Sequence, residues 1–555
     1  MSELKRRRVY HVAVAYLVVG LGVLGAAELI LEPLGLEALM PFIVVLTMLG
    51  FPLAMVLAWA YELHPEDAGR GSEKDRTVEG QKSIIVLPFD NISPDPSDAY
   101  LADGLTDELT THLSRLGSFR VISRSSAMAL KGTHKSIGSI AKELGVNFAL
   151  EGSVRKVGEM LRITAQLIDA REDQNLWANR YEGKLDDVFR FQEQASWAIV
   201  DALNVRIRPV DAGQPPSLSS ENPEGYEQYL RARHELNLGT PESLRAGLRH
   251  MQAAFNAFGP NELILQGMAE AQLFLVEYGM DDEGKALQRA EEFMTELEQR
   301  STDSAATYYL RGKIARIKGD HVAVYRNSRR AVELDPNNAS ALVNLVSSAA
   351  LQLGRPERVD DDVDRMLALD PFNPLALLVA GHHAMVSRNN QVALDRFQKA
   401  IELEPDFIHA RVIGSAFVHS WQGLRERAIE ELESLTQNAS REPLIDMARL
   451  LVCALRSDRE GLTRALSEAA AERVWVDPEA PYFMSSALAL AGDAENALSW
   501  LERAMACGWY NFPLFAEIDP HFACLREDPR FQRLLDRVRG LWEEAGRELL
   551  RGVSH

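Results

Sequence analysis

The sequence predicts an α+β multidomain protein with two transmembrane helices, a small mixed α/β domain and an all-α solenoid. Three observations predict this architecture. Two long apolar segments occur within the first 61 residues, short strand-like and helix-like segments then alternate, and the second half contains prolines at a regular interval. Pro336, Pro371 and Pro405 each follow an acidic residue and lie 35 and 34 residues apart. A period of about 34 residues is typical of a solenoid built from helix pairs.

The first 61 residues predict a membrane hairpin. A basic N-terminus, residues 1–8, precedes apolar segments at 9–31 and 38–61. The second segment has no charged residue and, at about 1.5 Å per residue, exceeds the hydrocarbon thickness of about 30 Å. Basic residues flank the pair and none lies in the loop, so the positive-inside rule places the soluble domains in the cytoplasm. We therefore expect localisation in the bacterial inner membrane, with the lipid bilayer contacting residues 9–61.

Three other interpretations of the first apolar segment stay open. A basic start followed by Gly25-Ala26-Ala27 is also found in cleavable signal peptides. Residues 20–25 match G-x-G-x-x-G, but a dinucleotide site would need a strand, a helix and a second strand around them. If the segment did not span the bilayer, because of Glu28, the soluble part would be periplasmic.

Residues 62–82 predict a polar linker, and the following segment, 83–205, predicts a mixed sheet covered by helices. Apolar runs rich in β-branched residues indicate strands, and leucines at helical spacing indicate helices. The expected strands are 83–89, 119–123, 146–157, 161–169 and 176–181, and the expected helices are 100–116, 136–144 and 185–203. Ser136 is the predicted N-cap of the second helix and Gly145 its end.

Several phrases in this segment resemble a known domain. They are Val86-Leu87-Pro88-Phe89-Asp90-Asn91, Tyr100-Leu101-Ala102-Asp103-Gly104-Leu105-Thr106-Asp107-Glu108-Leu109, Glu143-Leu144-Gly145-Val146, Leu150-Glu151-Gly152-Ser153-Val154-Arg155 and Leu161-Arg162-Ile163-Thr164-Ala165-Gln166-Leu167-Ile168-Asp169-Ala170. In this order they resemble the TolB-like amino-terminal domain, related to FlgO-type domains. The resemblance implies a bacterial chain in which this domain follows an adenylate cyclase or winged-helix domain. Only the membrane hairpin precedes Ser83 here, so we expect neither activity.

After a linker at 206–223, residues 224–518 predict helical repeats, and residues 519–555 a C-terminal helical cap. The unit that ends at Pro405 contains Gly381, Ala393, Phe397 and Ala400. These positions resemble the tetratricopeptide consensus, in which small residues let the two helices approach and an aromatic ring fills the space between units. Other glycines fall at the turns between the helices of later units: Gly354, Gly423 and Gly492.

The resemblance to tetratricopeptide repeats implies a partner-binding groove lined by the first helix of each unit. Alignment on the terminal prolines places eight candidate residues there: Tyr309, Lys313, Arg316, Asn344, Ser348, His382, Phe417 and Trp421. Lys313 and Arg316 are about one helical turn apart, so the pair could hold an acidic side chain or a peptide carboxylate. The alternative is a solvated helix face.

The composition limits the functions to be considered. A net charge of −20 argues against nucleic acid as a partner, because such binding needs a basic surface. The three cysteines have no metal-site spacing and suit a reducing compartment. The sequence contains no catalytic constellation, and we predict no enzyme activity, no cofactor and no metal site.

Four polar clusters are candidates for ligand sites. Acidic residues at 95, 98, 103, 107 and 108 could bind a metal, but turn formation and the helix dipole explain them better. Adjacent His382 and His383 point different ways, unlike a zinc pair. Asp360-Asp361-Asp362 is expected to be the solvated start of a repeat helix, and Arg124-Ser125-Ser126 to cap a turn rather than touch a phosphate.

Two functions therefore remain. The first is a membrane-anchored protein–protein interaction scaffold or signalling adaptor that holds a protein or peptide partner in the repeat groove. The alternative is a regulatory sensor that binds a small ligand in the TolB-like domain. The sequence leaves the identity of the partner and the oligomeric state open.

Overall fold

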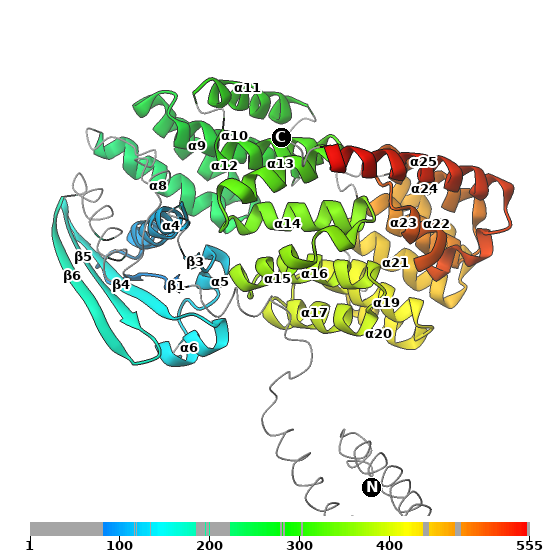
Figure 1. Ribbon diagram of the computed structural model, residues 1–555, viewed down its shortest axis with the longest axis horizontal. Helices are drawn as coiled ribbons and strands as arrows, with labels where there is room; N and C mark the ends of the chain where they lie inside the picture. Colours follow the sequence, from blue (N-terminus) through cyan, green and yellow to red (C-terminus); the bar gives the residue numbers. More distant parts are fainter. Residues whose placement is uncertain are drawn as a thin grey trace, which may run out of the picture. The chain divides into compact units, whose positions relative to one another are not determined.

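The computed structural model describes residues 82–184, 222–300, 303–436, 443–471 and 479–551, apart from a few positions within these ranges, together with residues 195 and 199. The chain divides into two compact units, Met1–Gln81 and Lys82–His555, and all the described residues belong to the second. This unit contains an α/β module, residues 82–184, followed by a helical array, residues 223–551 (Figure 1).

The described residues contradict the prediction of a two-span membrane protein. None of their helices combines the length and apolar character needed to cross a bilayer. On this finding, the fold class with two transmembrane helices and the localisation in the bacterial inner membrane are corrected. The segments predicted to span, 9–31 and 38–61, lie outside the described residues, as does the predicted helix at 185–203 except for residues 195 and 199.

The α/β module contains a mixed sheet with the strand order β3-β1-β4-β5-β6, and β2 pairs with β4 beside this path. Its strands are β1 (Ser83–Val86), β2 (Asp90–Asn91), β3 (Arg120–Val121), β4 (Phe148–Val157), β5 (Met160–Asp169) and β6 (Gln174–Lys184). β1 pairs in parallel with β3 and β4, whereas β4, β5 and β6 form an antiparallel meander. The sheet is mixed, as the sequence predicted.

Helices cover both faces of this sheet. The module's helices are the 3₁₀ turn η3 (Pro96–Asp98), α4 (Ala99–Arg115), α5 (Arg124–Met128) and α6 (Ile137–Leu144). α4 lies between the sheet and the first helix of the array (Figure 1), in a core that includes Leu105, Leu109 and Ile163. α6 lies on the other face. It is capped by Ser136 and ends at Gly145, whose φ of +61° belongs to the left-handed region, so both predicted ends are confirmed.

The helical array consists of antiparallel helix pairs joined by short turns. Its first six helices are α8 (Pro223–Leu238), α9 (Pro241–Phe258), α10 (Glu262–Glu277), α11 (Lys285–Arg300), α12 (Ala305–Ile317) and α13 (His321–Leu334). The middle of the array contains α14 (Ala339–Ser347), continued by a π-helical turn η5 (Ser348–Gln352), then η6 (Pro356–Arg358), α15 (Asp360–Leu369), α16 (Pro374–Val386), α17 (Asn390–Leu403), α18 (Ile408–Ala410), η7 (Arg411–Ser415), α19 (Ala416–Trp421) and α20 (Arg425–Thr436). The last elements are α21 (Pro443–Arg456), α22 (Arg459–Ala471), α23 (Ala480–Leu490), α24 (Ala494–Ala506), η8 (Leu514–Ile518), η9 (Pro520–Leu525) and α25 (Pro529–Arg551).

The repeat consensus has the predicted physical basis in the unit of α16 and α17. A β-carbon on Gly381 would lie 2.2 Å from Cε1 of Phe397, so only glycine lets the ring lie against α16. At the turns between helices, Gly354, Gly423 and Gly492 all have positive φ angles, between +60° and +77°. Such angles are strained for other residues. The fold of the array is therefore that of tetratricopeptide-like repeats.

Candidate functional site

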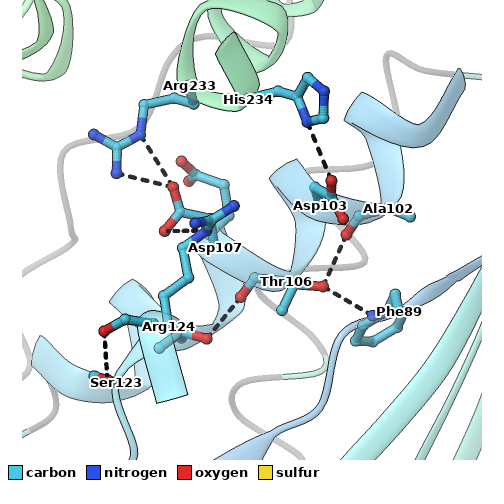
Figure 2. Close-up of polar contacts among 12 residues, drawn as sticks. Phe89, Ala102, Asp103, Thr106, Asp107, Ser123, Arg124, Arg233 and His234 are labelled. Carbon is cyan, nitrogen blue, oxygen red and sulfur yellow. Dashed lines mark hydrogen bonds and ion pairs between the residues drawn. The ribbon is translucent and has the colours of Figure 1, made fainter. Parts of the chain in front are cut away.

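The first candidate site is a layer of charged side chains between α4 of the module and α8 of the array. Asp107 is 6% exposed, and its Oδ2 accepts hydrogen bonds from Nη2 of Arg233 at 2.8 Å and from Nε at 3.1 Å. Its Oδ1 lies 3.7 Å from Nε of Arg124 in α5. Asp103 binds Lys131 on one oxygen, and its other oxygen is 3.1 Å from Nδ1 of His234. Figure 2 shows Asp103 and Asp107 on one helix, with Arg233 and His234 approaching from α8.

These contacts correct the explanation given for the acidic cluster. α4 begins at Ala99 and has no acidic residue in its first turn, so the helix dipole does not account for Asp103 and Asp107. Burial alone would raise the pKa of Asp107, but the charges of Arg233 and Arg124 lower it below its ordinary value. Burial likewise opposes the ionised form of Asp103, and hydrogen bonds from His234 and Lys131 lower its pKa. The acids join the module to the array.

Neighbouring polar residues of α4 extend this layer. Burial and the nearby Asp107 raise the pKa of Glu108, which accepts a hydrogen bond of 3.1 Å from the hydroxyl of Tyr229. Nearer the start of α4, the Tyr100 hydroxyl donates to Glu227 Oε1 at 2.7 Å. The Thr106 hydroxyl donates to the Ala102 carbonyl and accepts from the Phe89 amide, which ties α4 to the sheet (Figure 2).

The second candidate site is a carboxylate of the array held by serines of the module. Asp370, in the turn before α16, accepts hydrogen bonds from the hydroxyls of Ser125 and Ser126, each at 2.6 Å, and from Ser123. It is 2% exposed. The sequence predicts that Arg124-Ser125-Ser126 caps a turn, with a phosphate site as the alternative. The structure shows a short helix capped by Ser123, with the hydroxyls directed at this carboxylate.

The turns that end two successive repeats both contact the module. The side chain of Asn337 donates to the carbonyls of Ser114 and Phe119, each at 3.1 Å, and accepts from the Val121 amide. In the next turn, Phe372 is 9% exposed and belongs to the apolar core of the module around α6. The turns at Asp335-Pro336 and Asp370-Pro371, which carry the repeat signature, therefore also contact the module. We call these contacts, around residues 337 and 370–372, the turn seam.

The third candidate site is a cavity of about 840 Å³ beside the sheet face that α6 covers. Strand residues form one wall: Glu151, Ser153, Thr164, Gln166 and Arg180. The segment between α5 and α6 forms another, with Leu130, Lys131, Thr133 and Lys135. The volume lies within the range of small-molecule sites, roughly 300–1,000 Å³. The lining mixes apolar, hydroxyl, amide and charged groups, so it suits a polar organic ligand.

The predicted groove residues fall into two groups. Tyr309, Lys313 and Arg316 share one neighbourhood on α12, where Lys313 Nζ is 3.1 Å from Glu277 Oε2 and Arg316 contacts the other oxygen of that carboxylate. Burial alone would lower the pKa of Lys313, but Glu277 raises it. The acidic side chain proposed for this pair is thus one of the protein's own.

The second group lies in the interior of the array. Ser348, His382 and Phe417 are 1–2% exposed, while Asn344 and Trp421 are half-buried. His382 bonds to the Ile413 carbonyl, and its ring, like that of Phe417, contacts Phe483. The neighbouring His383 lies 3.1 Å from Asp360, which with Asp361 and Asp362 begins α15 as predicted; Asp362, however, is buried and pairs with Arg329 at 2.8 Å instead of facing solvent.

The C-terminal segment, residues 507–528, covers the first helices of the later repeats. Trp509 stacks on Tyr482 of α23 with ring centroids 4.7 Å apart, and Asn511 donates to the carbonyls of Ala350 and Leu351. Trp509 and Asn511 are fully buried. Where this segment lies, the predicted groove is filled by the chain itself, which sequence periodicity could not reveal.

His521 and Asp519 of this segment lie with Ser420 of α19 in the order of nucleophile, base and acid. His521 Nε2 is 2.8 Å from Ser420 Oγ, but Nδ1 is closer to Ser486 Oγ, at 2.9 Å, than to Asp519, at 3.8 Å. The three residues are 8%, 6% and 0% exposed. Burial lowers the pKa of His521. The arrangement ties η9 to α19 and α23 as an internal hydrogen-bond network.

Comparisons with known proteins match parts of the chain. Residues 80–195 match the family described as the second domain of HilA/YgeH-like transcriptional regulators. A protein of Rhizobium meliloti (strain 1021), described as "Putative adenylate cyclase 3", is 38% identical over 177 residues, which are 31% of this chain. The chain spans only 30% of the length of that relative.

Solved structures show remote likeness, and two of them illustrate it. A tetratricopeptide repeat protein from Parabacteroides merdae is 14% identical, with a TM-score of 0.35, and the match covers 51% of this chain and 98% of that protein. TolB from Acinetobacter baumannii is 21% identical, with a TM-score of 0.18, over 25% of this chain and 30% of TolB. Both likenesses are too remote to assign a function.

Proposed function

We propose that this protein is a non-catalytic interaction scaffold that binds a protein partner on its helical array. Arrays of helix pairs expose an extended surface whose shape is set by contacts between neighbouring units. The observation that supports a binding face most directly is the fixed geometry of Lys313 and Arg316. Internal contacts hold both cations on one side of α12, next to two aromatic rings.

An acidic segment of a partner is the ligand we propose for this face, where it would contact Arg316 beside the internal carboxylate of Glu277, which already pairs with both cations. Lys313 Nζ lies 4.5 Å from the ring centroid of Phe274 and 6.0 Å from that of Tyr309, and its side chain is 7% exposed. The Arg316 side chain is 34% exposed and is the member of the pair that a partner can reach. Side chains held in place before binding lose less conformational entropy on association. Arginine is also suited to planar carboxylates.

The test compares two arginines of the same helix. Full-length wild type, Arg316→Gln and the control Arg311→Gln are used as bait in cells of the native host. Arg311 is also partly exposed and pairs with Glu298. We expect one protein to be recovered in stoichiometric amount with wild type and Arg311→Gln, and at least tenfold less with Arg316→Gln. Equal recovery with all three baits would remove this face from the proposal.

The sequence-derived domain boundaries belong to the same proposal. In it, residues 83–205 act as a TolB-like domain and residues 224–518 as the repeat domain, with no cyclase activity in either. The resemblance of the quoted phrases supports the first assignment. Purified full-length protein should convert no ATP to cyclic AMP, and turnover abolished by a point substitution within 83–203 would refute it.

A second candidate function, a small-ligand sensor, is favoured by the cavity of about 840 Å³. Ala178 is an exposed residue of β6 that lines it. Ala178→Trp should obstruct part of the cavity, whereas Met160→Trp, at the exposed end of the β4–β5 hairpin, should leave it open. A metabolite that shifts the melting temperature of wild type and Met160→Trp, but not of Ala178→Trp, would support the sensor. A shift retained by Ala178→Trp would place the ligand elsewhere.

A further inference from the structure

One short segment, residues 123–133, both lines the cavity and binds the array. At its start, Ser123, Ser125 and Ser126 hold Asp370 of the array. Four residues after Ser126 the chain reaches the cavity wall, which Leu130 and Lys131 line. Leu130 also belongs to the same apolar core as Phe372. A displacement of this wall would therefore also move the residues that contact the array at the turn seam.

Lys131 provides a direct polar connection from the cavity to α8. Its ammonium group pairs with Asp103 Oδ1, and Asp103 Oδ2 lies 3.1 Å from Nδ1 of His234 in α8. The Asp103 side chain is 5% exposed, whereas that of Lys131 is 46% exposed. A buried carboxylate depends on its partners, because removal of one partner leaves charge uncompensated. The contact between Asp103 and His234 is thus expected to weaken when the ammonium group of Lys131 moves away from Asp103.

Lys135 supplies the matched comparison. It lines the same cavity, and its side chain is 44% exposed, close to the value for Lys131. Its partner is Glu143 of α6, at 2.6 Å, which is itself 40% exposed. This pair lies within the module and does not contact the array. The two lysines therefore differ mainly in their partners. Lys131 pairs with the buried Asp103, which contacts α8, whereas Lys135 pairs with the exposed Glu143.

We propose that Lys131 couples the cavity to the helical array, so that a ligand which engages its ammonium group weakens the hold of Asp103 on α8. The proposal rests on the ligand-sensor function given above and adds its regulation. Coupling of this kind is reciprocal: contacts that stabilise α8 on the module would strengthen the Lys131–Asp103 pair and alter the affinity of the cavity. The cavity and the partner-binding array would then act as one regulated unit.

The test is hydrogen exchange on the full-length protein, without any ligand. Lys131→Met keeps the aliphatic stem and removes the ammonium group, as a bound anion would remove it from Asp103. We expect amides of α8, Pro223–Leu238, to exchange at least threefold faster in Lys131→Met than in wild type. Lys135→Met should leave α8 at the wild-type rate, and Lys131→Arg, which retains a cation, should restore protection.

Three results would overturn the coupling. They are unchanged exchange in α8 of Lys131→Met, an equal increase in Lys135→Met, and a uniform increase over the whole module instead of a local one. Because no ligand is used, these results are independent of whether a metabolite binds the cavity. Failure of the sensor function and failure of the coupling are therefore told apart.

Discussion

Asp370 Oδ1 lies 2.6 Å from Ser126 Oγ, although the two residues are 244 positions apart in the chain. The same serine hydroxyl accepts a hydrogen bond of 2.9 Å from the Phe372 amide. A repeat turn and the short helix α5 thus satisfy each other's polar groups in a buried place. The module is joined to the array by specific contacts, and these can be tested one at a time.

The first prediction concerns this carboxylate. Asp370→Ala leaves the buried hydroxyl of Ser126, and the more exposed hydroxyls of Ser123 and Ser125, without their acceptor, which should lower the free energy of unfolding by about 3 kcal/mol. The control is Asp406→Ala in the next repeat turn, where the aspartate is exposed and a change within about 0.5 kcal/mol is expected. Urea unfolding followed by circular dichroism measures both. Similar losses in the two variants would show that the serine contacts add nothing to stability.

The second prediction concerns the apolar part of the turn seam. Phe372→Ala removes a ring from the module core and should destabilise the protein by about 3 kcal/mol, because the space is only partly refilled. Phe407, half-buried in the following turn, is the matched position outside the module core. We expect Phe407→Ala to cost less and to leave the near-ultraviolet signal of the module unchanged. A larger loss for Phe407→Ala would contradict the assigned role of Phe372.

The third prediction compares two glycines in helices. Gly381→Ala forces a methyl group against the Phe397 ring and should be destabilising by at least about 2 kcal/mol, as overpacked cores are. Gly540→Ala, in α25, meets no atom within 4 Å and should stabilise the protein by about 0.5–1 kcal/mol through helix propensity. Thermal unfolding of the two variants should shift in opposite directions. Shifts of the same sign would be inconsistent with this account.

The fourth prediction concerns pH. Burial lowers the pKa of His321 to about 3 and that of His382 to about 4, both from 6.5. Between these values and 6.5 the unfolded chain binds more protons than the folded one, so stability is full above pH 6.5 and falls as the pH is lowered. We expect the double variant His321→Gln/His382→Gln to lose less stability between pH 7 and pH 5 than wild type. Parallel losses would exclude these histidines as the cause.

Local features of the fold could be predicted because they depend on neighbouring residues. Ser136 caps α6 and Gly145 ends it, since a hydroxyl acceptor and a left-handed backbone are requirements of the helix ends themselves. The spacing of Pro336, Pro371 and Pro405 likewise indicated the repeats. Prediction was weaker where an apolar pattern alone was used, as with the transmembrane helices.

The candidate sites could not be predicted in the same way. The eight groove residues follow from the repeat spacing, but their exposure depends on residues far away in the chain. Phe417 is buried because His521 and Phe483 cover it, and Lys313 is buried beside Glu277. Nothing in the local sequence indicates that residues 507–528 return to the first helices of the later repeats.

The sequence by itself determined the repeat period, the small residues that allow the helices to approach, and the order of the longer strands and helices in the described part of the module, though not β2 or α5. These depend on backbone preference, helix capping and apolar periodicity, which act over a few residues. The tertiary structure alone decided the partners of Asp103, Asp107 and Asp370. A carboxylate has the same local signature whether it faces water, a metal or a distant arginine, and only the long-range packing of the chain selects among them.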